Sequence, residues 1–106
     1  MYVSIWEFQV APDVEDRFRH EYGPDGGWVA LFRRAPGYLS TRLLCDRVDP
    51  LRFLTVDIWE SEEAHDAFRR ECAVAFAELD DACKALTLRE LPVGRFTTLD
   101  GATPIF

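Results

Sequence analysis

The stretch LTVDIWESEEAH, residues 54–65, decides the fold. Its first half alternates as a strand does, so one face receives Leu54, Val56 and Ile58 and the other receives Phe53, Thr55, Asp57 and Trp59. Ser61 ends this pattern and can cap a helix, whose first turn favours the carboxylates of Glu62 and Glu63. The strand-to-helix corner therefore carries Trp59 at the end of the strand and His65 at the start of the helix.

The helix that follows is expected to run from Ser61 to about Leu86. At 3.6 residues per turn, its buried stripe contains Ala64, Phe68, Cys72, Ala75, Phe76, Leu79, Ala82, Cys83 and Leu86. His65 falls inside the stripe, whereas Asp66, Arg69 and Arg70 fall on solvated faces. A buried imidazole needs a hydrogen-bond partner. His65 is therefore either a histidine at the edge of the core that bonds a backbone carbonyl or a functional group.

Composition excludes several classes of protein. The chain has 106 residues, 48% of them hydrophobic and 29% charged, as expected for one globular domain. The net charge of −7, without a Lys/Arg run, disfavours binding to nucleic acid and to anionic membranes. No apolar run approaches the roughly 20 residues of a membrane span, and no basic segment opens the chain, so we expect a cytoplasmic protein. Its three cysteines lack the spacing of a disulfide framework or a zinc site.

The remaining elements follow from periodicity and turn residues. We expect strands at 2–10, 38–46, 52–60 and 87–98, with an irregularity at 92–94. A first helical region begins at Pro12, is interrupted at 23–27 and resumes over 28–34. His20 lies opposite the apolar face of this region and is expected to be solvated. Residues 1–106 form one domain, with a core at 2–97 and a tail at 98–106.

The order β-α-β-β-α-β is that of a ferredoxin-like α+β sandwich. Right-handed crossovers place both helical regions on one face of a four-stranded antiparallel sheet, with the first and third strands in the centre. The other face would expose Val3, Ile5, Leu54, Val56 and Ile58 in a single chain. Such a patch predicts a homodimer that pairs face to face through the sheet.

Three groups of residues resemble the antibiotic biosynthesis monooxygenase family of dimeric α+β barrels. They are Trp59-Glu60-Ser61-Glu62-Glu63-Ala64, the preceding Pro36-Gly37-Tyr38-Leu39, and Phe18 on the first helix. The resemblance covers about residues 2–97 and implies two ferredoxin-like sheets paired into one barrel, with a pocket between sheet and helices in each protomer. The family includes cofactor-independent oxygenases that turn phenolic polyketide intermediates into quinones, haem-degrading enzymes and proteins without known activity.

The resemblance assigns residues in the quinone-forming pattern. Trp59 matches its tryptophan, while His65 stands where that pattern has tyrosine and Thr55 where it has asparagine. The haem-degrading pattern fails at three positions: its asparagine is replaced by Trp6, its helical tryptophan by Phe68, and no histidine occurs near Phe76 to ligate haem. We expect no cofactor, because there is no glycine-rich phosphate loop and no metal-ligand cluster.

A cofactor-free oxygenase must take a proton from its substrate, hold the anion and exclude water. His65 is a candidate base because its charge changes near neutral pH. Asp57, on the face of Trp59, could orient His65 or act as the base, or could instead form a salt bridge with Arg42 on the neighbouring strand. The expected catalytic set is thus His65, Asp57 and Trp59. The expected substrate-binding set, which plain core packing would explain equally well, is Thr55, Trp6, Phe8, Tyr22, Trp28, Phe32 and Phe68.

Two functions remain open. The first is a cofactor-independent monooxygenase, or a related cofactor-free isomerase or cyclase, acting on an aromatic, polyketide-like small molecule. The second is a non-catalytic dimeric α+β barrel that binds a small apolar ligand or has only a structural role. A cavity beside Trp59 that reaches His65 and Asp57 would favour the enzyme. An interior filled by the side chains of Phe68, Phe32 and Tyr22 would favour the second.

Overall fold

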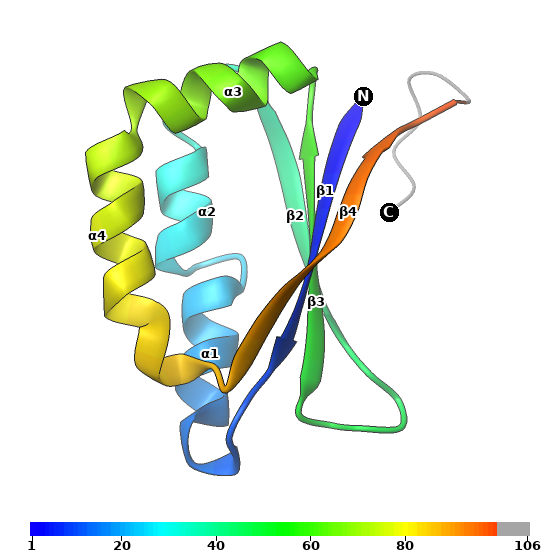
Figure 1. The fold of residues 1–106 in the computed structure, drawn as a ribbon, viewed down its shortest axis with the longest axis vertical. Helices are drawn as coiled ribbons and strands as arrows, with labels where there is room; N and C mark the ends of the chain where they lie inside the picture. The colour runs from blue at the N-terminus through cyan, green and yellow to red at the C-terminus, as the bar shows by residue number, and fades with distance from the viewer. Residues whose placement is uncertain (100–106) are drawn as a thin grey trace.

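A computed structural model describes residues 1–99 of the chain. Figure 1 shows one sheet with all of the helices on a single face. The elements, in order, are β1 Tyr2–Gln9, η1 Pro12–Val14, α1 Glu15–Tyr22, α2 Gly27–Phe32, β2 Tyr38–Cys45, β3 Arg52–Trp59, α3 Glu62–Glu71, α4 Ala73–Cys83, η2 Lys84–Leu86 and β4 Arg89–Thr97. The tail predicted at 98–106 lies, from residue 100 onward, outside the described residues.

The sheet has the predicted topology. Its order is β2-β3-β1-β4, and every neighbouring pair is antiparallel. β1 and β3 are therefore the central strands, and the ferredoxin-like α+β fold is confirmed. The expected irregularity in the last strand is also present, because the register between β1 and β4 shifts between Ile5 and Trp6, which face Gly94 and Pro92.

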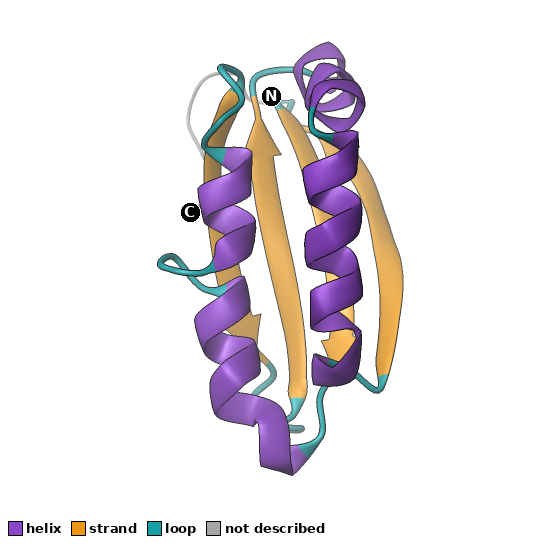
Figure 2. Cartoon of the chain, turned by 90° about the vertical axis from the view of Figure 1, so that its left-hand side faces the viewer, coloured by secondary structure: helices purple, strands orange, loops and turns teal. Residues whose placement is uncertain are grey.

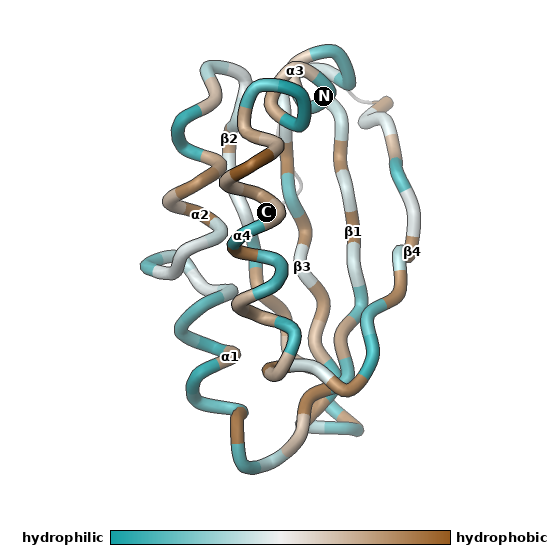
Figure 3. Tube along the Cα trace, turned by 60° about the vertical axis from the view of Figure 1, so that its left-hand side comes forward, coloured by the Kyte–Doolittle hydropathy of each residue, from teal (hydrophilic) through white to brown (hydrophobic). Residues whose placement is uncertain are grey.

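The first crossover contains two short helices, as predicted, after the 3-10 turn η1. Figure 3 colours α1 as mostly hydrophilic, in agreement with its two buried residues, Phe18 and Tyr22. The loop of residues 23–26 between α1 and α2 passes very close to the last turn of α1. A Cβ atom on Gly26 would lie 2.2 Å from the carbonyl oxygens of both His20 and Glu21, so only glycine fits there.

The second helical region differs from the prediction of one helix from Ser61 to Leu86. The helix ends at Cys72, whose φ of −108° and ψ of 23° separate α3 from α4. In Figure 2, α3 is seen end-on above α4, which runs beside α2 and α1 along the sheet. The break turns the chain so that Phe68 packs on Phe32 and Phe76 packs on Trp28, with ring centroids 5.4 Å and 5.0 Å apart.

The two faces of the sheet carry separate apolar clusters. The main core lies between sheet and helices and is largely aromatic. On the opposite face, Val3, Val56 and Ile58 form a second cluster against which Met1, Ile5 and Leu44 pack. The expectation that a single chain would expose this face is wrong for Val3, Val56 and Ile58, which are each no more than 3% exposed, whereas Ile5 and Leu54 are partly exposed.

None of the helices within residues 1–99 is both long enough and apolar enough to cross a membrane.

Candidate functional site

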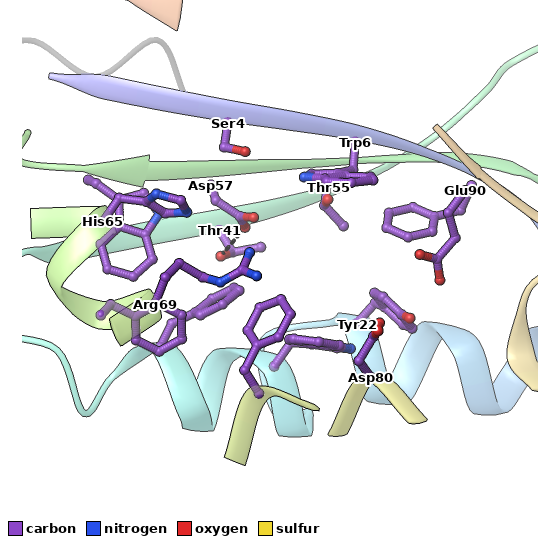
Figure 4. Close-up of a pocket in the computed structure, with 16 residues that line it drawn as sticks. Ser4, Trp6, Tyr22, Thr41, Thr55, Asp57, His65, Arg69, Asp80 and Glu90 are labelled. Carbon is purple, nitrogen blue, oxygen red and sulfur yellow. Dashed lines mark hydrogen bonds between the residues drawn. The ribbon is translucent and has the colours of Figure 1, made fainter. Parts of the chain in front are cut away.

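A cavity of about 310 Å³ lies between the sheet and the helices. Figure 4 shows its wall, which is formed by Ser4, Trp6, Phe8, Tyr22, Trp28, Phe32, Thr41, Thr55, Asp57, Trp59, His65, Phe68, Arg69, Phe76, Asp80 and Glu90. The cavity reaches both Asp57 and His65. The side chains of Phe68, Phe32 and Tyr22 line it and do not fill it. This arrangement is the one that the enzyme hypothesis required.

All ten residues of the expected catalytic and substrate-binding sets line this cavity. Their roles remain predictions, because lining a cavity does not establish chemistry. Six lining residues were not predicted: Ser4, Thr41, Arg69, Phe76, Asp80 and Glu90. Ser4 and Thr41 could have been found from the strand register, since both lie beside Asp57 on the face that strand alternation gives to the helices.

The aromatic wall centres on Trp59, which is 1% exposed. Its ring contacts Phe32 at a centroid distance of 5.6 Å, Phe68 at 5.2 Å and His65 at 5.2 Å. These rings are therefore both core and cavity wall. The flat apolar surface that they offer suits an aromatic ligand.

Asp57 is a buried carboxyl group on the central strand β3. Its Oδ1 accepts a hydrogen bond of 2.7 Å from the Thr41 hydroxyl, and Thr41 in turn accepts one of 2.8 Å from the Tyr38 hydroxyl. Burial raises the pKa of Asp57 to about 6, and the hydrogen bond from Thr41 opposes this rise. A carboxyl group with such a pKa can take up and release a proton near neutral pH.

The expected salt bridge between Asp57 and Arg42 is wrong. Arg42 lies opposite Val56 in the β2–β3 register, and Thr41 lies opposite Asp57. Since neighbouring residues of a strand point to opposite faces, Arg42 projects to the face away from the helices. Asp57 makes no ion pair with any residue in the range 1–99.

His65 lies in the first turn of α3, which begins as predicted. The Ser61 side chain caps this helix by accepting a hydrogen bond of 3.1 Å from the Ala64 amide. The half-buried imidazole packs on Trp59 and on Tyr2, 5.3 Å away between ring centroids. Its Nδ1 lies 3.4 Å from Oδ1 of Asp66, so the contact is with a carboxylate and not with the backbone carbonyl that one interpretation expected.

Burial lowers the pKa of His65, and the nearby Asp66 carboxylate opposes this change. The imidazole is therefore mainly neutral at pH 7 and can accept a proton. Asp57 and His65 share the cavity wall in Figure 4, but no hydrogen bond joins them among the described residues. The contacts therefore do not support the idea that Asp57 orients His65.

Arg69 is the most informative residue that the prediction missed. Its guanidinium carbon lies 3.8 Å from the centroid of the Phe76 ring, and the side chain extends along the cavity in Figure 4. It is exposed, as predicted, yet it forms no ion pair within residues 1–99. A signal was available: Arg69 follows His65 by four residues, which places both on one side of a helix.

The opposite end of the cavity is acidic. Figure 4 places Tyr22, Asp80 and Glu90 together, away from His65 and Arg69. One oxygen of Glu90 accepts a hydrogen bond of 3.1 Å from the Thr87 hydroxyl. Within the described part of the chain, no three His, Cys, Asp or Glu side chains are arranged to hold a metal ion. The aromatic wall of the cavity thus has His65 and Arg69 at one end and Asp80 and Glu90 at the other, with Asp57, Thr41 and Thr55 between them.

A model of one known family, described as antibiotic biosynthesis monooxygenase, matches residues 1–78, well over half of the chain. This chain belongs to the antibiotic biosynthesis monooxygenase family. The match spans Trp59, Asp57, His65 and Arg69 and confirms the resemblance seen in the sequence. Asp80 and Glu90 lie beyond the matched residues.

Solved structures of the family share this fold. A protein from Nitrosomonas europaea that carries the family's name has a TM-score of 0.72 at 17% identity, with 96% of this chain and 93% of that chain covered. SnoaB, a cofactor-independent oxygenase from Streptomyces nogalater, has a TM-score of 0.66 at 26% identity, with 92% of each chain covered. PA3566 from Pseudomonas aeruginosa has a TM-score of 0.66 at 20% identity, over 92% of this chain and 93% of that chain. No curated protein matches the chain.

Proposed function

We propose that this chain is a cofactor-independent monooxygenase that oxidises an aromatic, polyketide-like small molecule inside the cavity. The observation that carries the proposal is an aromatic-walled cavity onto which a buried carboxyl group, Asp57, and a largely neutral imidazole, His65, both open. Membership of the family and the likeness to SnoaB, a cofactor-independent oxygenase at 26% identity, support it.

In the proposed reaction, a base removes a proton from a CH₂ group that lies between aromatic rings. The resulting carbanion is electron-rich enough to react with dioxygen directly. Conversion of CH₂ and O₂ into C=O and H₂O balances without any further reductant. The protein takes the proton, holds the flat anion and excludes water.

Asp57 is the stronger candidate for the base. It is buried at the centre of the sheet, and burial raises its pKa to about 6, so above that pH it is an ionised carboxylate with a substantial affinity for protons. His65 lies nearer the solvent and packs edge-on against Trp59. We assign to Trp59 the wall that holds the ring of the substrate, and to His65 a proton relay toward the leaving oxygen.

Oxygen uptake tests the proposal. The probes are phenolic tricycles that contain a CH₂ group flanked by aromatic rings, and the variants are Asp57→Asn and His65→Ala. We expect oxygen consumption by the wild type and a loss of about 10²-fold or more in Asp57→Asn. The control is His20→Ala, since His20 is exposed and does not line the cavity. Wild-type activity equal to that of Asp57→Asn would overturn the proposal.

The second candidate is a non-catalytic protein that binds a small apolar ligand. It is favoured by the burial of Trp59, Phe68 and Phe32, which serve the core whether or not a reaction occurs. Tight binding of polycyclic aromatics without any turnover, in the wild type and in Asp57→Asn alike, would support this alternative. A cofactor-free isomerase or cyclase would instead change the substrate without consuming oxygen.

We also propose that two copies of the chain pair through the face of the sheet opposite the helices. Support comes from Leu91 and Phe96, which β1–β4 pairing places on that face beside Glu7 and Val3 and which remain 43% and 47% exposed. Sedimentation equilibrium should give twice the mass of one chain for the wild type and a lower mass for Phe96→Asp. A monomeric wild type would exclude this pairing.

A further inference from the structure

A chain of two hydrogen bonds leads from Tyr38 to Asp57. The Tyr38 hydroxyl donates to Thr41 Oγ1 over 2.8 Å, and the Thr41 hydroxyl donates to Asp57 Oδ1 over 2.7 Å. Thr41 and Asp57 face each other across β2 and β3. Thr41 lines the cavity, whereas Tyr38 does not.

Tyr38 decides which way the Thr41 hydroxyl points. A threonine hydroxyl has a single proton and can otherwise rotate among several partners. Because the phenol of Tyr38 donates to the Thr41 oxygen, the Thr41 proton is left to be donated to Asp57. The ring of Tyr38 is itself fixed between Phe32 and Trp59, at centroid distances of 5.5 Å and 5.4 Å.

The two oxygens of Asp57 therefore differ. Oδ1 accepts the bond from Thr41, while no hydrogen bond to Oδ2 is formed within residues 1–99. Asp57 lines the cavity, so Oδ2 is the oxygen available to a ligand. We propose that Thr41, held in orientation by Tyr38, is a positioning residue that occupies Oδ1 of Asp57 and leaves Oδ2 to take the substrate's proton. The catalytic part of this inference rests on the proposed function, whereas the effect on Asp57 ionisation does not.

The surroundings of Asp57 contain few other groups that could set its ionisation. The charged and titratable side chains that share the cavity wall with Asp57 are Tyr22 on α1, His65 and Arg69 on α3, Asp80 on α4 and Glu90 on β4. Outside the wall, Tyr38 on β2 bonds Thr41, and Arg95 on β4 pairs with Ser4, the β1 neighbour of Asp57. None of them makes an ion pair or hydrogen bond with Asp57 in the described residues. Burial raises the pKa of Asp57, and the bond from Thr41 is what lowers it.

The test measures Asp57 ionisation directly, by titrating the ¹³C carboxyl signal of labelled aspartates in the unliganded protein, with Asp57→Asn identifying the signal. We expect Thr41→Val to raise the Asp57 titration midpoint by about one pH unit, because the charged form loses a hydrogen bond. Tyr38→Phe should raise it by less, since the Thr41 hydroxyl can then rotate away.

Two variants control for general disturbance of the strand. Thr41→Ser keeps the hydroxyl and should titrate within a few tenths of a unit of the wild type. Ser40→Ala changes the neighbouring residue, which faces Ile58 on the other side of the sheet, and should leave the midpoint unchanged. An unchanged or lowered midpoint in Thr41→Val, or a shift in Thr41→Ser equal to that in Thr41→Val, would overturn the inference.

The pH dependence of oxygen uptake then separates the two proposals. If Asp57 is the base, the acidic limb of the rate profile should move upward in Thr41→Val by the same amount as the carbon signal. Shifted carbon signals without oxygen uptake by any variant would contradict the proposed function and leave the role of Thr41 in place. Loss of oxygen uptake in Asp57→Asn without a shifted carbon signal in Thr41→Val would support the proposed function and contradict the role of Thr41.

Discussion

The guanidinium group of Arg69 lies over the ring of Phe76, with its central carbon 3.8 Å from the ring centroid. The stacking holds the long side chain along the cavity wall, where it forms no ion pair within residues 1–99. An arginine held in this way offers free donors to a planar anion. Arg69 thus adds a positive charge to the end of the cavity that contains Asp57 and His65.

Arg69→Met should weaken the binding of aromatic anions selectively. Titration calorimetry with 2-naphthoate and 2-naphthamide compares ligands of equal shape with and without a charge. We expect the variant to bind naphthoate roughly five- to tenfold more weakly, about 1 kcal/mol, because the guanidinium is partly exposed to solvent. The amide should be affected much less.

Arg70→Met provides the control, because Arg70 is the next residue on α3 and does not line the cavity. Its affinity for naphthoate should equal that of the wild type. Equal weakening of naphthoate and naphthamide in Arg69→Met would mean that Arg69 contributes packing and not charge.

Asp57→Asn should stabilise the protein at neutral and alkaline pH. Burial raises the pKa of Asp57 to about 6, so the native state binds its proton more tightly than the unfolded state. Stability linked to that proton is fully present below the unfolded pKa near 4 and is lost as the pH rises through 6. The amide has no such loss, so the variant should gain roughly 1 to 3 kcal/mol relative to the wild type at pH 8.

Urea unfolding of both proteins at pH 4 and pH 8 measures this effect. The difference between variant and wild type should be near zero at pH 4 and should grow with pH. If the difference in the free energy of unfolding is the same at pH 4 and pH 8, ionisation of Asp57 does not destabilise the native protein. A less stable variant at pH 8 would show that the carboxylate has a favourable partner in solution.

Trp59→Ala should cost far more stability than Trp6→Ala. Both side chains line the cavity on neighbouring central strands, but Trp59 is 1% exposed and Trp6 is 36% exposed. We expect losses in the free energy of unfolding of about 3 to 5 kcal/mol for Trp59→Ala and about 1 kcal/mol for Trp6→Ala. Urea unfolding followed by circular dichroism gives both free energies. Similar losses for the two variants would mean that the structure around position 59 collapses into the space left by the Trp59 side chain.

The strand-to-helix corner was predictable because its signals are local. Alternation places Trp59 and Asp57 on one face, and Ser61 starts the helix that presents His65. The order of the strands was predictable for a different reason, because right-handed crossovers in a β-α-β-β-α-β chain place the first and third strands in the centre. Asp57 and Trp59 then line the cavity because both lie on the face of the sheet that the helices cover.

Other parts of the site depend on tertiary packing. Residues 61–86 contain no proline or glycine to mark the end of a helix, so their pattern predicts one continuous helix. The partner of Asp57 depends on strand register, and a shift of one residue exchanges Thr41 for Arg42, which points to the opposite face. The position of Arg69 over Phe76 requires the break at Cys72, because the two residues lie on different helices.

The break at Cys72 also distributes the lining residues of the second helical region over two helices. His65 and Arg69 stand on α3, while Phe76 and Asp80 stand on α4. The two helices meet at a single residue, and α4 contributes both Phe76, which supports Arg69, and Asp80 at the remote end. Changes at Asp80 can alter what the remote end accepts while Phe76 still supports Arg69 and while Asp57 and His65 keep their positions, so ligand preference and proton chemistry can vary separately within one small domain.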